Sequence, residues 1–257
     1  MPPSLSNIKN ARKLSAYLFK NEQKSAFHSR PAETFWPENV IKILKNDNVV
    51  RQVLTIGKDI PDDKLVGFIV SDATRLFAIS ATVFSESDER LRQAMEIFHE
   101  NNFGDKELSA EIKDDNYSSD YSASLRARLA VLEGGEENIE SEEGKNKDDD
   151  DDDREDEEGS DDDDDKDNNS LWHVANIRRF DEYQWKALVP TFRTDKPEYN
   201  FRSSAILPFL SKETNNDRKG AFSIVYKVSI HRNHFVDEEV PVSIFCCSQP
   251  SSHGLQH

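Results

Sequence analysis

The chain has 257 residues, with 33 Lys and Arg against 50 Asp and Glu, which gives a formal net charge of −17. Residues 133–167 hold 22 acidic and 4 basic side chains, so the rest of the chain is close to neutral. No apolar run is long enough to cross a bilayer as a helix, and no continuous apolar segment near the N-terminus indicates a secretory signal. We therefore expect no membrane partner. The only two cysteines are adjacent, Cys246 and Cys247, so we expect no disulfide partner and a reducing compartment, cytoplasmic or nuclear.

The first half of the chain is predicted to be mostly helical. Residues 1–30 carry a weak amphipathic pattern, which predicts an N-terminal helix that is loosely attached. A proline separates this helix from a mostly helical domain over residues 31–132. Pro37 suits the first turn of a helix, and Asn46 or Asp47 can cap the next one.

The apolar stretch over residues 62–84 fits either one long buried helix or two strands. Its apolar positions follow a helical period better than alternation, so we expect a helix. Ser87 or Asp88 is predicted to cap a further helix, which ends near Gly104. One face of that helix carries an apolar stripe typical of core packing: Leu91, Ala94, Met95 and Phe98.

The acidic segment, residues 133–170, is predicted to be a disordered linker. Its aspartates repel one another, and residues 144–169 have no apolar side chain that could form a core. The segment is either a solvated linker or an arm that binds basic protein partners. Nucleic acid is excluded as a partner of this segment because its phosphates would be repelled.

Order is expected to resume in an aromatic-rich helical segment over residues 171–206. Asp181 can cap its helix and Pro190 can end it. Together with the strands expected further on, these patterns predict an α+β fold: a mostly helical N-terminal region, a disordered acidic linker and a short antiparallel β segment.

Residues 207–257 are expected to contain that β segment and an irregular tail. Apolar and polar residues alternate over residues 221–230, which predicts a strand. Residues 240–245 could pair with it in an antiparallel hairpin. His231 and His234 fall in the intervening turn, where we expect both to be exposed to solvent.

The turn that opens this strand resembles the start of the glycine-rich lid of protein kinases, which covers the ATP phosphates, and keeps one of its three glycines. Small residues are needed there because backbone amides must approach the phosphates closely. Gly220 would be the second glycine of the lid, followed by Ala221, and Phe222 would be the tip. Ser223 would replace the third glycine, and Val225 would pack against the adenine.

Further segments, in the same order and spacing, resemble fungal protein-kinase-domain proteins that have a helical N-terminal region. They are FWPE at 35–38, VVRQVL at 49–54, RLFAI at 75–79, IFHENNFGD at 97–105, FDEYQW at 180–185, VPTF at 189–192, LPF at 207–209 and VYKVSIH at 225–231. The resemblance implies the start of an ATP-dependent Ser/Thr-type kinase domain near Leu207, with ATP and Mg as cofactors.

Several residues that the kinase reaction needs are missing. No lysine follows Lys227, so Ser243 stands where the phosphate-binding Lys of the next strand would fall. The chain also has no catalytic loop and no metal-binding Asp, and Arg218 occupies the first glycine position. We therefore expect a truncated start of a kinase N-lobe that is inactive as it stands and binds MgATP weakly or not at all. The alternative is a non-catalytic interaction protein that uses its helical domain and acidic arm to bind basic partners.

Overall fold

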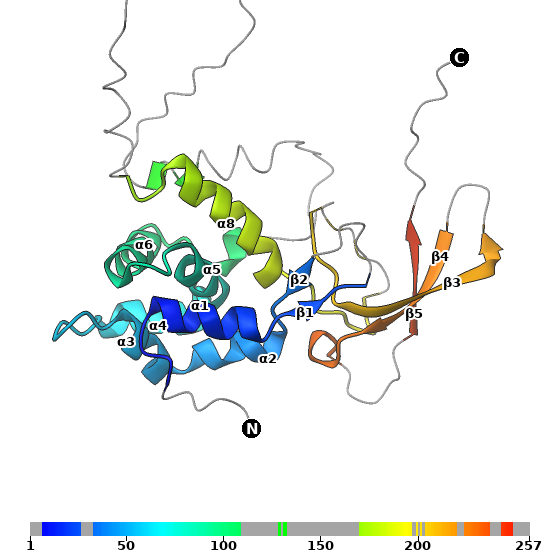
Figure 1. Cartoon of the computed structure of the whole chain (residues 1–257), viewed down its shortest axis with the longest axis horizontal. Coiled ribbons are helices and arrows are strands. Elements are labelled where there is room, and N and C mark those ends of the chain that lie inside the picture. Colours follow the sequence, from blue (N-terminus) through cyan, green and yellow to red (C-terminus); the bar gives the residue numbers. More distant parts are fainter. Residues whose placement is uncertain are drawn as a thin grey trace, which may run out of the picture.

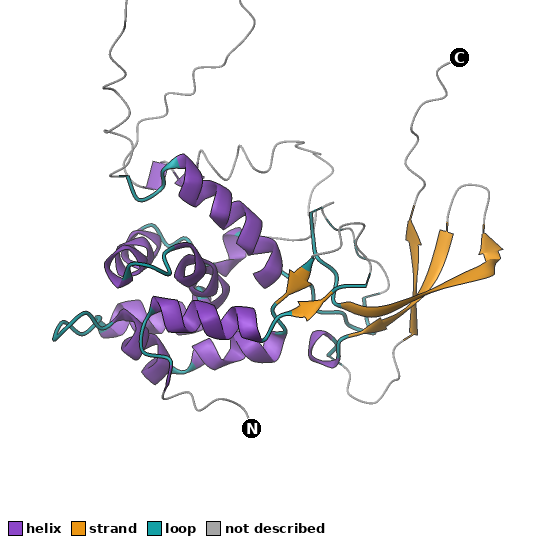
Figure 2. Cartoon of the chain, viewed as in Figure 1, coloured by secondary structure: helices purple, strands orange, loops and turns teal. Residues whose placement is uncertain are grey.

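A computed structural model describes part of the chain, in ranges separated by gaps. The described residues are 7–26, 33–108, 128–129, 131–132, 170–196, 199, 201, 204–219, 224–236 and 243–248. They form seven α-helices beside two small antiparallel sheets, so the α+β class is confirmed (Figures 1 and 2). Apart from Ser170, the acidic linker lies outside the described residues.

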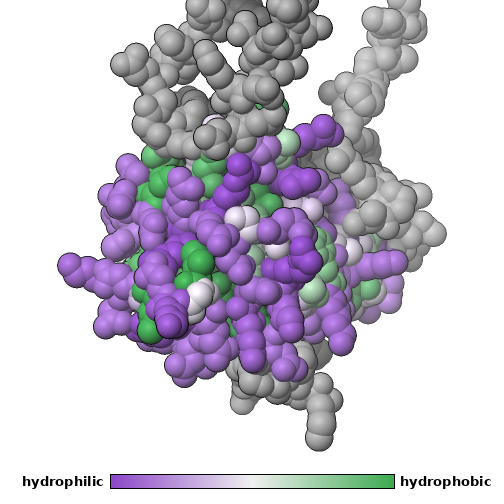
Figure 3. Space-filling model, turned by 60° about the vertical axis from the view of Figure 1, so that its left-hand side comes forward, coloured by the Kyte–Doolittle hydropathy of each residue, from purple (hydrophilic) through white to green (hydrophobic). Residues whose placement is uncertain are grey.

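The helices gather on one side of the sheets and share one apolar core (Figure 1). They are α1 (Ala11–Lys20), α2 (Glu38–Ile41), α3 (Asp47–Leu54), α4 (Asp63–Asp72), α5 (Thr74–Val83), α6 (Asp88–Glu100) and α8 (Val174–Ala187), with the 3-10 turns η2 (Lys42–Lys45), η3 (Asp105–Glu107) and η5 (Arg232–His234). The central helix is α5, which packs against α1, α4, α6 and α8 and buries nearly every side chain. The face turned forward in Figure 3 is mostly hydrophilic, with smaller hydrophobic areas between the polar side chains.

Several helix ends lie where the sequence predicts them. The Asn46 side chain caps α3 by accepting a hydrogen bond from Asn48 N, and the Ser87 side chain caps α6 by accepting one from Arg90 N. Pro37 stands one position before α2 rather than within its first turn. Helix α6 ends at Glu100, and Gly104 follows in a tight loop.

The apolar stretch over residues 62–84 is helical, but the expectation of one long helix is wrong. The chain bends by 105° between α4 and α5. No proline or glycine lies at the break. Instead, the Asp105 carboxylate accepts hydrogen bonds from Arg75 N and Leu76 N, and so caps α5 from a distant part of the chain. No single helix among the described residues is long and apolar enough to cross a membrane, although α4 and α5 reach that length and composition when counted together.

Helix α1 is an integral part of the helical core rather than a loosely attached segment. Leu14 and Leu18 are fully buried, and the helix packs along α5. The backbone N–H of Ala11 also donates to Asp88 Oδ1 at 2.8 Å. The amphipathic pattern looks weak because the small residues Ala11 and Ser15 complete the buried face.

Helix α8 begins at Val174, earlier than the predicted cap at Asp181. His173 occupies the N-cap position, and the side chain of Asn176 donates to Leu171 O. Asp181 lies inside the helix, where its carboxylate accepts a hydrogen bond from Gln184. Aspartate favours helix caps, but the apolar residues on both sides of Asp181 continue the helical pattern, so the helix runs through this position.

The larger sheet is an antiparallel meander of β3 (Phe209–Lys219), β4 (Ile224–Ile230) and β5 (Ser243–Ser248), in that spatial order. Strand β4 is the strand predicted over 221–230, and β5 pairs with it as expected, three residues later than predicted. Both cysteines therefore lie in β5 and not in an irregular tail. Strand β3 also runs through residues 211–219, whose polar composition gave no strand pattern. The smaller sheet pairs β1 (Gln23–Lys24) with β2 (Thr34–Phe35).

Apolar residues join the helices to the meander. Phe35, Val189 and Ile206 form a buried cluster at this junction, and a second cluster under the sheet contains Phe192, Leu207, Phe209 and Val228. Backbone hydrogen bonds tie the smaller sheet to both sides of this junction, from Ala26 N to Phe209 O of β3 and from Trp36 N to Lys186 O of α8. The sheet therefore packs on the helical unit through contacts distant in the sequence.

Candidate functional site

The candidate nucleotide site lies at the tip of the β3–β4 hairpin. Lys219 and Ile224 form the last described pair before the turn. Gly220, Ala221, Phe222 and Ser223 lie outside the described residues. Val225 lies on β4 and pairs with Cys247 of β5, so β5 is the neighbouring strand at this position.

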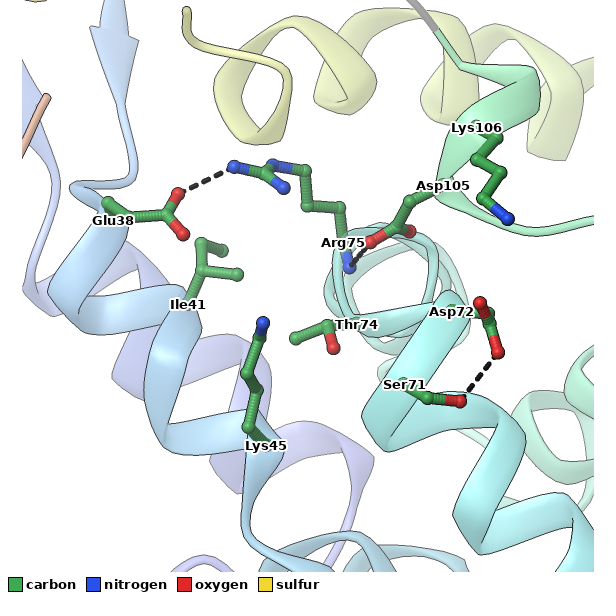
Figure 4. Close-up of a pocket in the computed structure, with 9 residues that line it drawn as sticks. All are labelled: Glu38, Ile41, Lys45, Ser71, Asp72, Thr74, Arg75, Asp105 and Lys106. Atoms are coloured by element: carbon green, nitrogen blue, oxygen red, sulfur yellow. Dashed lines mark hydrogen bonds and ion pairs between the residues drawn. The ribbon is translucent and has the colours of Figure 1, made fainter. Parts of the chain in front are cut away.

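A separate pocket lies among the helices and was not identified from the sequence. Its volume is about 200 Å³, and it opens between η2, the α4–α5 bend and η3 (Figure 4). Charged and polar side chains dominate its lining, which consists of Glu38, Ile41, Lys45, Ser71, Asp72, Thr74, Arg75, Asp105 and Lys106.

Asp105 lines one wall of this pocket, and its carboxylate caps the N-terminus of α5. Its Oδ2 accepts from Arg75 N at 3.0 Å and its Oδ1 from Leu76 N at 2.9 Å. Burial raises the pKa of this carboxyl, against the opposing effect of the two backbone hydrogen bonds and of the nearby Arg75 and Lys45 charges. Gly104 permits the approach, because a Cβ there would lie 2.6 Å from Asp72 O.

Arg75 connects three helices at the same place. One guanidinium nitrogen pairs with Glu38 Oε2 at 2.6 Å, and Nε donates to Ala187 O at 3.1 Å. The first contact reaches the start of α2, and the second reaches the end of α8. The guanidinium is therefore already bound to protein groups in this arrangement.

Two lysines on the rim of the pocket have no such partners. Lys45 and Lys106 are exposed, and neither has an ion pair or hydrogen bond within the part of the chain that the structure describes. In Figure 4 the Lys45 side chain extends into the space between Ile41 and Thr74. Asp72, at the end of α4, accepts a hydrogen bond from the Ser71 hydroxyl at 2.5 Å.

His234 lies at the junction of the helices and the sheet, and the expectation that it is exposed is wrong. Only 1% of its surface is accessible. Nε2 accepts from Glu38 N at 3.1 Å, and Nδ1 lies 3.2 Å from Pro190 O, to which it can donate in the neutral tautomer. Its ring packs edge-on against Phe35, 5.5 Å between centroids.

This environment keeps His234 neutral. Burial, followed by the neighbouring His231, lowers the pKa of His234 to about 3. His231 is half-buried, and its pKa is lowered by burial and by the charge of Arg232. Neither histidine belongs to a candidate metal site, because no group of three or more His, Cys, Asp or Glu residues in the described ranges could hold a metal ion.

Comparisons of the chain with protein-family models, curated proteins and solved structures gave no match. The function is therefore argued from the residues and the geometry alone. No local sequence pattern indicated the structural roles of Asp105 and His234, because their hydrogen-bond partners lie on elements far away in the sequence.

Proposed function

We propose that the chain is a protein-kinase-related polypeptide that does not transfer phosphate as it stands, and whose helical unit supports the first strands of a kinase-like N-lobe. The observation that carries this proposal is the three-stranded antiparallel order β3–β4–β5, in which the β3–β4 pairing shifts register at two places. The residues of the glycine-type turn fall between its first two strands. A third strand beside the lid strand is where such a lobe holds its phosphate-binding Lys.

The composition of β5 supports the lack of catalysis. Its six residues, from Ser243 to Ser248, include no lysine and no other charged side chain. Without a lysine on this strand, the α- and β-phosphates of a bound ATP would lack the charge partner that kinases provide there. The catalytic base and the metal-binding Asp of the family are also missing from the sequence.

Restoring the missing lysine tests this assignment. The register pairs Ser243 with Ser229 and Val225 with Cys247, so strand alternation puts Ser243 and Val225 on the same face of the sheet. Ser248 falls on the opposite face. We expect Ser243→Lys to tighten MgATP binding about tenfold, because it adds a charge-assisted contact to phosphate, while Ser248→Lys leaves it unchanged. Equal effects of the two substitutions in a nucleotide-competition titration would contradict a kinase-like arrangement.

A second function is favoured by the charge of the acidic segment. Its net charge of −18 is carried between two parts of the helical core, α6 and α8. We propose that this segment binds basic protein partners through charge attraction. Deleting residues 144–169 should abolish salt-sensitive binding of a lysine-rich peptide and leave the melting temperature unchanged. Retained peptide binding, or a large fall in melting temperature, would argue against an electrostatic arm.

A further inference from the structure

The two outer strands of the larger sheet differ in how their edges are protected. In the spatial order β3–β4–β5, both β3 and β5 have a side along which no other strand of the described residues pairs. An unpaired edge presents a row of backbone N–H and C=O groups to which another strand can add. Proteins usually protect such edges with charged side chains, prolines or bulges, so the two strands can be compared on these features.

Strand β3 carries two of these protective features. Its pairing with β4 shifts register at two places, which makes its edge irregular. The loop after β1 also lies beside its first residue, because Ala26 N donates to Phe209 O. Its sequence includes five charged residues, Lys212, Glu213, Asp217, Arg218 and Lys219. The outer edge of β3 is therefore poorly suited to accept a further strand.

Strand β5 has neither charges nor irregular pairing. Its six residues, Ser243–Ser248, include no charged residue and no proline. Its pairs with β4 follow one another without a register shift, from Ser229 and Ser243 to Ile224 and Ser248. Within the described ranges, β4 is the only element that packs extensively against β5. The outer side of β5 is therefore a regular edge along which another strand can pair.

The chemistry of β5 and the symmetry of such a pairing favour a second copy of this chain as the added strand. Two uncharged β5 strands can lie side by side without electrostatic repulsion. When they pair antiparallel about a twofold axis, each strand fills the open edge of the other. The joined sheet then ends in β3 on both sides, which is the charged strand with the shifted register. The assembly therefore closes at two copies and leaves no unprotected edge.

We propose that the protein forms a homodimer in which β5 pairs antiparallel with β5 of a second copy. A single pair of strands makes the contact, so the dimer is weak and depends on protein concentration. The acidic segment leads into the start of α8, which is the end of that helix turned away from the sheets (Figure 1). Its charge therefore joins the helical unit away from the β5 edge. The proposal does not depend on nucleotide binding at the β3–β4 hairpin.

Sedimentation equilibrium of the full chain over a range of protein concentrations tests the dimer. We expect a reversible equilibrium between monomer and dimer, with no larger species. Phe245→Glu puts a charge on the edge strand, and we expect it to weaken dimerisation by about tenfold. Phe245 pairs with the exposed Lys227, so the new carboxylate faces an opposite charge within the chain and the β4–β5 pairing is kept. The matched control, Leu210→Glu at a half-exposed position of β3, should dimerise as the wild type does.

Amide hydrogen exchange of the unmodified chain locates the contact and does not rely on the folding of a variant. Raising the protein concentration should slow exchange in β5 and leave exchange in β3 unchanged. Circular dichroism of Phe245→Glu should match that of the wild type. A monomer at every concentration, species larger than a dimer, or equal dimerisation of Phe245→Glu and the wild type would overturn the proposal. So would protection that increases in another element and not in β5.

Discussion

At the scale of single residues, His234 connects three segments of the chain. Its ring bonds to the first residue of α2, to Pro190 after α8 and, through packing, to Phe35 of β2. The acceptor at Nε2 exists only in the neutral imidazole. Protonation would both charge a buried group and break the bond from Glu38 N, so the native state disfavours the imidazolium.

Acid should therefore destabilise the fold through His234. Its folded pKa of about 3 lies below the ordinary value of 6.5, so the unfolded chain binds the proton more readily. The contribution is complete above pH 6.5 and is lost as the pH falls toward 3, at up to about 1.4 kcal/mol per pH unit. Urea unfolding between pH 7 and pH 4 measures this slope.

The matched variants are His234→Gln and His173→Gln, the second at the N-cap position of α8. We expect His234→Gln to be less stable at pH 7 and to lose much of the acid slope. His173→Gln should keep the slope of the wild type. An unchanged slope in His234→Gln would mean that other groups control the acid response.

Two glycines give opposite expectations for the same substitution. A Cβ at Gly104 would lie 2.6 Å from the backbone oxygen of Asp72, whereas nothing lies within 4 Å of one at Gly67, on the exposed side of α4. Gly104→Ala should therefore destabilise the fold by about 1–3 kcal/mol. Gly67→Ala should stabilise it by about 0.5–1 kcal/mol, because a helix interior favours alanine. Thermal unfolding of the two variants checks the signs, and the same sign for both would contradict the packing around η3.

At the scale of elements, the bend between α4 and α5 depends on a cap from outside the helix. Ala73, at the N-cap position of α5, has no side chain that can accept a hydrogen bond. The carboxylate of Asp105 accepts instead from the backbone N–H groups of Arg75 and Leu76. The Thr74 hydroxyl adds hydrogen bonds to Ile69 O and Val70 O across the bend. The pocket that Lys45 and Lys106 line lies beside this bend.

Removing this cap should destabilise the helical unit. We expect Asp105→Ala to lower the free energy of unfolding by about 2 kcal/mol, since two backbone amides lose their acceptors. Asp105→Asn keeps one acceptor oxygen and should lose less. Glu100→Gln, at the exposed end of α6, is the control. Chemical unfolding of the three variants measures the differences, and an Asp105→Ala protein as stable as the control would contradict the capping role.

The elements that the sequence predicted correctly are those set by local patterns. Asn46 and Ser87 cap helices through bonds to residues two or three positions away, and the alternation in β4 is visible in the sequence. The division of residues 62–84 into two helices was missed because its cause, Asp105, lies about 30 residues along the chain. The first turns of α8 were missed because the residue at the N-cap position, His173, is not a typical N-cap residue and its side chain makes no capping hydrogen bond.

The candidate sites divide in the same way. The turn at Gly220 was predicted from a local pattern of small residues and lies outside the described residues, between the described strands β3 and β4. The buried state of His234 results from contacts with residues 44 and 196 positions away, which no local pattern indicates. The pocket is likewise lined by residues of α2, η2, α4, α5 and η3, which only the tertiary structure brings together.

At the scale of the whole molecule, a helical unit and a three-stranded sheet are joined through one buried junction. The aromatic ring of Phe35 packs there with Val189 and Ile206, and His234 contacts it from the sheet side. A three-stranded sheet needs a packed hydrophobic face to be stable, and this sheet packs its face, with Phe209 and Val228, against Phe192 and Leu207. The helical unit therefore supplies the support that the β3–β4 hairpin needs.

We propose that this hairpin corresponds to a kinase nucleotide lid that lacks the charges needed to hold a nucleotide. Equilibrium titration of the full chain with a fluorescent ATP analogue in the presence of magnesium tests it most directly. With Arg218 at the first glycine position and no lysine in β5, we predict no saturable binding at micromolar nucleotide. Micromolar affinity that unlabelled ATP competes away would contradict the account.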